Sequence, residues 1–307
     1  MPVYNRMVEY SQTHIFPGSN GKTIYSVLHI MAMGFQNSVL AMRASALAFK
    51  FMMAAIPALI LINTALPLLL PDDSKSILMT ILGTFLPSQI FQSIAKPVSE
   101  TASGFAGSVI SITAFTTLYF AVNGMRASIV IFNNSYHIRE NRPLLRQYGI
   151  ALLMVFILFL LALVSIPVFF LNQKVIGWLM MNELLPTFWT TSLVFLVKYA
   201  LFFIFILAIL SALYFLAPAR KHRFHLFSPG SIMASLCCII ASLGFDAFIS
   251  TFNKYDQVYG GISALFILML FLFILSMIFI IGFEINAALY FGVEKEPAKL
   301  KASDYAE

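Results

Sequence analysis

The chain has 307 residues, of which 60% are hydrophobic and only 10% are charged, and its formal net charge is +6. A soluble domain carries about 25% charged residues, and much of its surface must still meet water, so this composition excludes an ordinary soluble domain. The basic residues lie in short segments between apolar runs, which favours a membrane topology over nucleic-acid binding. The two cysteines, Cys237 and Cys238, are adjacent, and the five histidines show no metal-ligand spacing with them, so we predict neither a metal site nor a cofactor.

Six apolar segments are each long enough to cross a bilayer, which needs about 20 mostly apolar residues. Backbone groups in lipid must be paired within their own segment, so these segments are predicted to be helices, and the alternation typical of a membrane barrel is missing. The sequence therefore predicts an all-α, polytopic transmembrane helical bundle of about six spans. The predicted spans are residues 44–70, 104–131, 147–171, 190–217, 229–252 and 259–291.

All eight arginines fall on one side of this predicted topology. The loop after the second span holds Arg139, Arg142 and Arg146, and the loop after the fourth holds Arg220 and Arg223. Because cytoplasmic loops of membrane proteins are enriched in Lys and Arg, this side is predicted to be cytoplasmic, with both termini inside.

Two amphipathic stretches flank the first span. Residues 22–40 and 74–86 carry apolar side chains at helical spacing, which predicts interfacial helices. The remaining organisation is simple: a polar N-terminal tail over 1–21, a single membrane domain over 22–292 and a polar cytoplasmic tail over 293–307.

Lys50, Arg126 and Glu284 each interrupt an apolar span, and an ionisable group inside a span is costly and therefore a functional candidate. Counting about 1.5 Å per residue from the cytoplasmic span ends places all three roughly 10 Å inside the boundary. We predict an inner polar cluster at this depth, whose excess of positive charge leaves room for an anion. Its predicted members are Arg43, Lys50, Asn123, Arg126, Glu284 and Asn286. The alternative is that these long basic side chains only reach back to the interface.

Lys198 and Asp246 occupy similar depths near the outer ends of the fourth and fifth spans. They are predicted to form an outer ion pair. Such a pair between neighbouring helices serves either transport or nothing more than packing.

Sequence signatures of enzymes are missing from the chain. It contains no GxSxG, HExxH, Walker or dinucleotide-binding motif, so we predict no catalytic residues and expect that the protein is not an enzyme.

Several short motifs follow one another in a fixed order along the chain. They are residues 43–49, Ile56-Pro57, Leu86-Pro87, residues 133–142, Leu213-Tyr214, Pro218, Pro229-Gly230, Tyr259-Gly260-Gly261 and residues 282–287. In this order they resemble the YihY/virulence factor BrkB family of bacterial inner-membrane proteins, over about residues 25–292. The motif glycines are Gly230, Gly260, Gly261 and Gly282, and the chain departs from the family pattern at Phe283, where a small residue is usual.

The resemblance implies six helices and a multi-pass location in the bacterial inner membrane. Such proteins were once labelled ribonuclease BN, but this sequence has no metal-ligand cluster of the kind that phosphodiester hydrolysis uses, so ribonuclease activity is not expected. Family members are linked to serum resistance and to envelope processes, and some have been proposed to exchange ions. The partners implied are membrane lipids and other envelope proteins, not nucleic acid.

Three functions remain open from the sequence. The first is the handling or transport of an anionic or amphiphilic, lipid-like envelope component, with Lys50 and Arg126 as charge partners of its headgroup. The second is cation–proton exchange with Asp246 and Glu284 as carriers. The third is a non-transporting envelope scaffold, in which the buried charges matter only for stability.

Overall fold

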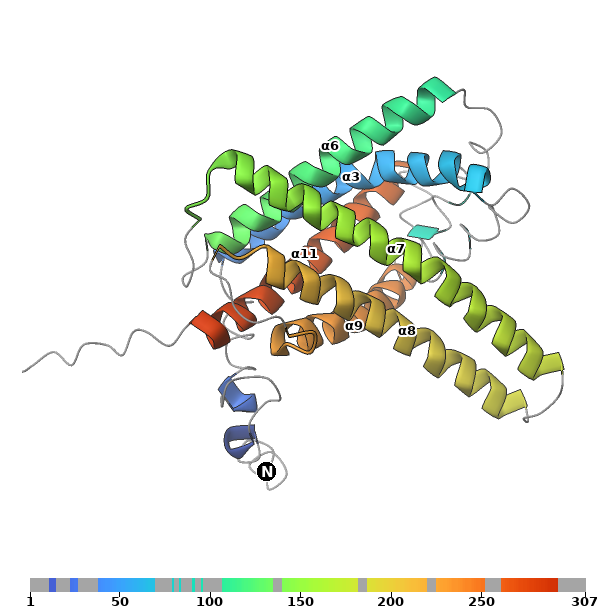
Figure 1. Cartoon of the computed structure of the whole chain (residues 1–307). Coiled ribbons are helices and arrows are strands. Elements are labelled where there is room, and N and C mark those ends of the chain that lie inside the picture. Colours follow the sequence, from blue (N-terminus) through green and yellow to red (C-terminus); the bar gives the residue numbers. More distant parts are fainter. Residues whose placement is uncertain are drawn as a thin grey trace, which may run out of the picture.

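The computed structural model is helical throughout its long elements (Figure 1). It describes residues 11–14, 23–26, 38–69, 107–134, 140–181, 187–219, 225–251 and 261–291, with the single positions 79, 83, 90, 91 and 95. The predicted interfacial helices at 22–40 and 74–86 fall largely outside these residues, as do the polar tail over 293–307 and most of the tail over 1–21. The division of the chain into one membrane domain and two tails therefore stays a prediction.

The described residues include six long helices, which confirms the predicted all-α polytopic bundle. They are α3 (Ser38–Leu69), α6 (Gly107–Asn133), α7 (Leu144–Met181), α8 (Thr187–Leu216), α9 (Pro229–Thr251) and α11 (Gly261–Phe291). Five of them are long and apolar enough to cross a membrane within their described residues, and the corresponding apolar stretch of α9, Pro229–Phe245, is shorter.

Two helix boundaries differ clearly from the prediction. Helix α3 begins at Ser38 rather than at 44, and α7 continues to Met181 rather than ending at 171. The apolar run of the third span stops at Asn172-Gln173-Lys174, but Gln and Lys are good helix formers, so the helix does not have to stop where hydrophobicity does. With 38 residues, α7 is about 57 Å long, well over the roughly 30 Å of a bilayer core.

The six helices form a closed ring of neighbours. Each packs against the next in chain order, and α11 returns to pack against both α9 and α3. The helices converge at one end, where α3, α7 and α9 begin and α6, α8 and α11 end; towards the other end α6 diverges from the α7–α8 hairpin (Figure 1). Since the arginine-bearing loops belong to the convergent end, we call it the arginine-rich end.

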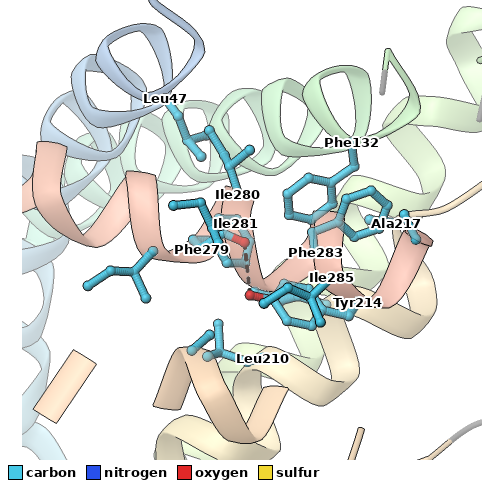
Figure 2. Close-up of a cluster of buried hydrophobic side chains, with 14 of the residues drawn as sticks. Leu47, Phe132, Leu210, Tyr214, Ala217, Phe279, Ile280, Ile281, Phe283 and Ile285 are labelled. Carbon is cyan, nitrogen blue, oxygen red and sulfur yellow. Dashed lines mark hydrogen bonds between the residues drawn. The ribbon is translucent and has the colours of Figure 1, made fainter. Parts of the chain in front are cut away.

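A core of aromatic side chains fills the bundle near the arginine-rich end (Figure 2). The rings of Phe132 and Phe283 are stacked at a centroid distance of 4.0 Å with an interplanar angle of 6°. Phe279 lies 4.9 Å from Phe132, and the hydroxyl of Tyr214 donates a 2.8 Å hydrogen bond to the carbonyl oxygen of Phe279. We call Phe132, Tyr214, Phe279 and Phe283 the aromatic cluster. The ring of Phe283 is thus a central part of the packing.

Helices α9 and α11 touch through two of the motif glycines. A Cβ atom on Gly230 would collide with the carbonyl oxygen of Gly282, and a Cβ on Gly282 would collide with the Tyr214 hydroxyl. Small residues permit such close backbone approach in membrane bundles, so Gly230 and Gly282 have a packing role. Gly261 begins α11, but its surroundings, like Gly260, lie outside the described part of the chain.

Candidate functional site

An apolar cavity of about 670 Å³ lies inside the ring of helices. Every one of the six helices contributes to its wall, and the lining side chains are almost all hydrocarbon or aromatic. They include Phe51, Ala55, Ala58 and Leu59 of α3, Met125 of α6, Leu158 and Ala162 of α7, Phe202, Phe205 and Leu213 of α8, Cys238 and Ser242 of α9, and Phe271, Leu275 and Phe279 of α11. Its volume falls within the roughly 300–1,000 Å³ typical of ligand sites.

Small side chains contribute to the space of the cavity beside the larger ones in its wall. Ala55 and Ala58 flank Pro57 on α3, and Ala162 of α7 lines the same cavity. Pro57 also lacks the N–H that would bond to the preceding turn, so this stretch of α3 is locally less rigid than an unbroken helix. The apolar lining and the small residues together suit a hydrocarbon ligand.

The aromatic cluster separates this cavity from the arginine-rich end. Phe279 belongs to both, since it lines the cavity and packs on Phe132. Phe51, also in the wall, has its ring centroid 6.2 Å from that of Phe279. Phe283 lies one helical turn further along α11 towards the arginine-rich end. A molecule passing from the cavity to that end would have to displace these rings.

Beyond the aromatic cluster, the structure pairs Arg43 with Glu284. One Arg43 guanidinium nitrogen lies 3.6 Å from the Glu284 carboxylate, with the two side chains 28% and 24% exposed. A second nitrogen donates a 2.8 Å hydrogen bond to the carbonyl oxygen of Asn134. The first and last helices, α3 and α11, are therefore neighbours, as the predicted equal depth of Lys50 and Glu284 required. The carboxylate of Glu284, however, pairs with Arg43 at the mouth of the bundle.

The other predicted members of the inner cluster lie in different places. Lys50 is an exposed residue on α3. Asn123 donates its side-chain hydrogen bond to Tyr119 O of its own helix, at 2.9 Å. Arg126 lies with its guanidinium carbon 4.9 Å from the centroid of the Tyr148 ring of α7.

Asn286 points to a third place, the start of α9. Its amide oxygen accepts a 2.8 Å hydrogen bond from the Gly230 N–H, and its amide nitrogen donates to the Ser228 hydroxyl at 2.9 Å. It therefore satisfies a helix N-terminus that would otherwise expose unpaired N–H groups. The predicted cluster is thus divided among the α3–α11, α6–α7 and α9–α11 contacts.

A polar clasp that the sequence analysis did not single out ties the arginine-rich end together. Arg142 donates to both carboxylate oxygens of Glu140, at 2.8 and 2.7 Å, and to the carbonyl oxygen of Ala217 at 2.7 Å. Asn133 donates to Glu140 at 2.6 Å and accepts from the Ala219 N–H at 2.7 Å. We call Asn133, Glu140 and Arg142 the clasp, because they join the end of α6 and the α6–α7 connection to the end of α8.

The clasp sets the charge state of Glu140, whose side chain is only 8% exposed. Burial opposes the charged form, but the hydrogen bonds and positive charge of Arg142 and the amide of Asn133 outweigh it, so the pKa of the Glu140 carboxyl lies below its ordinary value of 4.5. The clasp residues all fall within the motif at 133–142. That motif was the one signal in the sequence that pointed to these residues.

The side chains of the predicted outer pair, Lys198 and Asp246, lie outside the described residues, although α8 and α9 contain these positions. Among the described residues, no three His, Cys, Asp or Glu side chains are grouped as a metal site would require.

A ring of apolar helices around an apolar cavity defines the class of this molecule: a multi-pass α-helical membrane protein. The family model described as "Virulence factor BrkB" matches residues 31–304, and the chain belongs to that family. This confirms the family inferred from the ordered motifs.

Several known proteins are similar to the chain. The "Putative ribonuclease-like protein YfkH" of Bacillus subtilis (strain 168) is 26% identical over 252 residues, which cover 81% of this chain and 89% of that protein. A "UPF0761 membrane protein" of Vibrio atlanticus (strain LGP32) is 32% identical over 36% of this chain and 34% of its own length. The "UPF0761 membrane protein VV0203" of Vibrio vulnificus (strain YJ016) is 34% identical over a quarter of each chain. No solved structure matches the chain significantly.

Proposed function

We propose that this protein binds and moves an amphiphilic, lipid-like component of the bacterial envelope, and that the central cavity holds the hydrocarbon part of that molecule. The observation that carries the proposal is the apolar cavity of about 670 Å³ to which all six helices contribute. An apolar cavity of about 150 Å³ already binds benzene, so this one has room for a ligand several times larger. A flexible hydrocarbon chain matches both its lining and its size.

The polar part of the ligand belongs, under this proposal, at the arginine-rich end. Arg43 is there, and its pairing with Glu284 at 3.6 Å is long enough to be exchanged for an anionic group. The aromatic cluster would act as the barrier between this end and the cavity. The distribution of arginines supports a cytoplasmic position for the arginine-rich end, and we propose the inner membrane as the location.

The described geometry favours this function over cation–proton exchange. An exchanger needs carboxylates along its path, and the described residues that line the cavity include no Asp or Glu. The side chain of Asp246, the other carrier of that alternative, lies outside the described residues. Glu284 lies beyond the aromatic cluster, beside Arg43. We also propose that the protein acts without catalysis, and that the ribonuclease-like name of the Bacillus relative says nothing of this chain's activity. A pure scaffold, the third alternative, has no use for the cavity.

The experiment is native mass spectrometry of the protein extracted gently from its own membrane. Wild type is expected to retain an amphiphile that Ala58→Phe loses, because the new ring takes up part of the cavity that Ala58 lines. The matched control is Ala46→Phe, which adds the same ring at an exposed position of the same helix and is expected to retain the amphiphile. Equal retention by wild type and Ala58→Phe would contradict the proposal.

A further inference from the structure

Arg126 lies within the membrane-spanning helix α6, and among the described residues no carboxylate pairs with it. The carboxylates of Glu284 and Glu140 pair with Arg43 and Arg142. The Nε atom of Arg126 is buried and has no hydrogen-bond partner among the described residues. A guanidinium within a membrane-spanning helix needs a partner of opposite charge or access to water, so this side chain indicates where an anion would be stabilised.

The Tyr148 ring prepares the guanidinium for such a partner. The Arg126 guanidinium carbon lies 4.9 Å from the ring centroid, which is within the range of a cation–π contact. Stacking covers one face of the guanidinium plane, and because Nε is buried, a ligand from outside would meet the edge formed by the two terminal nitrogens. That edge has the fork geometry that matches two oxygens of a phosphate. Tyr148 itself is 39% exposed, so the contact lies at the surface of the bundle.

An apolar stripe leads along α6 to this point. Ile112, Phe115 and Tyr119 are all more than half exposed. The successive intervals from Ile112 through Phe115 and Tyr119 to Arg126 are three, four and seven residues, which keeps the four side chains on one helix face. From Ile112 to Arg126 the stripe runs about 21 Å, compared with about 15 Å for half of a bilayer core. An apolar stripe that ends in a half-buried cation matches the outline of one phospholipid.

We propose that the α6–α7 surface binds a phospholipid from outside the bundle, with its phosphate on the edge of Arg126 and an acyl chain along Ile112, Phe115 and Tyr119. The charge complementarity selects an anionic lipid over a zwitterionic one, since a second positive group near the phosphate would oppose Arg126. This site is separate from the central cavity and does not depend on the proposed function. Its occupant is a regular membrane lipid rather than transported cargo.

The test is a thermal-unfolding titration of the full-length protein in detergent with phosphatidylglycerol, compared with phosphatidylcholine of the same chain length. Phosphatidylglycerol is expected to raise the Tm of wild type at lower concentration than phosphatidylcholine does. In Arg126→Gln the apparent Kd for phosphatidylglycerol is expected to rise about tenfold or more, because a charge-assisted hydrogen bond is lost. Arg126→Lys keeps the charge without the fork and is expected to lie between the two.

The control is Arg146→Gln, which removes an exposed charge from the nearby start of α7 and is expected to leave the apparent Kd unchanged. Ala58→Phe is also expected to leave it unchanged, so failure here and failure of the cavity proposal are distinguishable. An unaltered Kd in both Arg126 variants, or an equal loss in Arg146→Gln, would overturn the proposal. Displacement of the lipid by excess inorganic phosphate would overturn it in favour of a free-phosphate site.

Discussion

The two halves of the bundle are built on opposite principles. At the arginine-rich end the helices converge, large rings interlock, and polar side chains are tied to one another and to backbone carbonyls. In the middle of the bundle the same helices line an apolar cavity of about 670 Å³, with alanines among the lining residues. One half is fixed by specific contacts, whereas the other leaves space that a ligand can occupy.

This difference explains how a membrane protein keeps a cavity without collapsing. Hydrophobic collapse does not drive helix association within lipid, so packing and hydrogen bonds must hold the helices. Here those contacts are gathered at one end, in the α9–α11 glycine contact and in the clasp. These contacts hold the ring of helices together at its arginine-rich end, so close packing in the middle of the bundle is not needed for that purpose.

The largest expected effect follows from Gly230. Replacing it with Val places side-chain atoms against the backbone of Gly282, which cannot move without separating α9 from α11. We expect a loss of about 3 kcal/mol or more of folding free energy, measured by thermal unfolding in detergent. The matched control is Gly244→Ala on the same helix, where an added Cβ meets nothing within 4 Å. If Gly230→Val is as stable as that control, the close α9–α11 contact is not a fastening point.

A loss of comparable size is expected from Arg142→Ala. The change leaves Glu140 mostly buried without its cation and frees the carbonyl oxygen of Ala217, and breaking such a pair typically costs about 3 kcal/mol or more. Adding Glu140→Gln to Arg142→Ala is expected to recover part of this loss, because the buried charge is then gone. A double variant no more stable than Arg142→Ala would argue against the clasp as an ion-paired unit.

The clasp also predicts a pH dependence with a definite sign. Because the pKa of Glu140 is lowered below its ordinary value of 4.5 in the folded protein, its contribution to stability is fully present above about that pH. It is lost as pH falls through the lowered pKa. Thermal unfolding measured towards more acidic pH should show this loss in wild type, and Glu140→Gln should lack this component. An identical pH dependence of stability in the two proteins would show that the clasp does not stabilise the ionised form of the Glu140 carboxyl.

The smallest effect is expected from Glu284→Gln. The Arg43–Glu284 pair is long and partly exposed, so its loss should change the free energy of unfolding by no more than about 1 kcal/mol. Retention of an amphiphile in the cavity should not fall, because the change leaves Arg43 available for the anionic group of the ligand. Measured beside Arg142→Ala, this variant separates an exchangeable pair from a structural one. A loss as large as that of Arg142→Ala would remove the distinction.

The sequence predicted the helices better than it predicted the site. Long apolar runs must be helical in lipid, so all six helices could be placed, and the depth of Glu284 correctly made α3 and α11 candidates for contact. Depth alone does not say which way a side chain points around its helix, and this is why Arg126, Lys50 and Asn286 separate in three dimensions.

The cavity and the clasp needed the structure. Ala55, Ala58 and Ala162 are ordinary residues of a membrane helix, and they define a space only when α3 and α7 are placed around α8 and α11. Glu140 and Arg142 belong to a loop whose path depends on the end of α8, 75 residues away from Arg142 in sequence. Periodicity carries no information on such contacts.

The central claim is that the cavity holds an amphiphile, and the most direct measurement is photo-crosslinking within the native membrane. A photoreactive phenylalanine analogue would replace Phe205, which lines the cavity, or Phe156, which is 54% exposed on α7. The account predicts that the probe at 205 captures one class of amphiphile saturably and loses it in the presence of Ala58→Phe, while the probe at 156 captures bulk lipid regardless. A probe at 205 that crosslinks only to neighbouring helices would contradict the account.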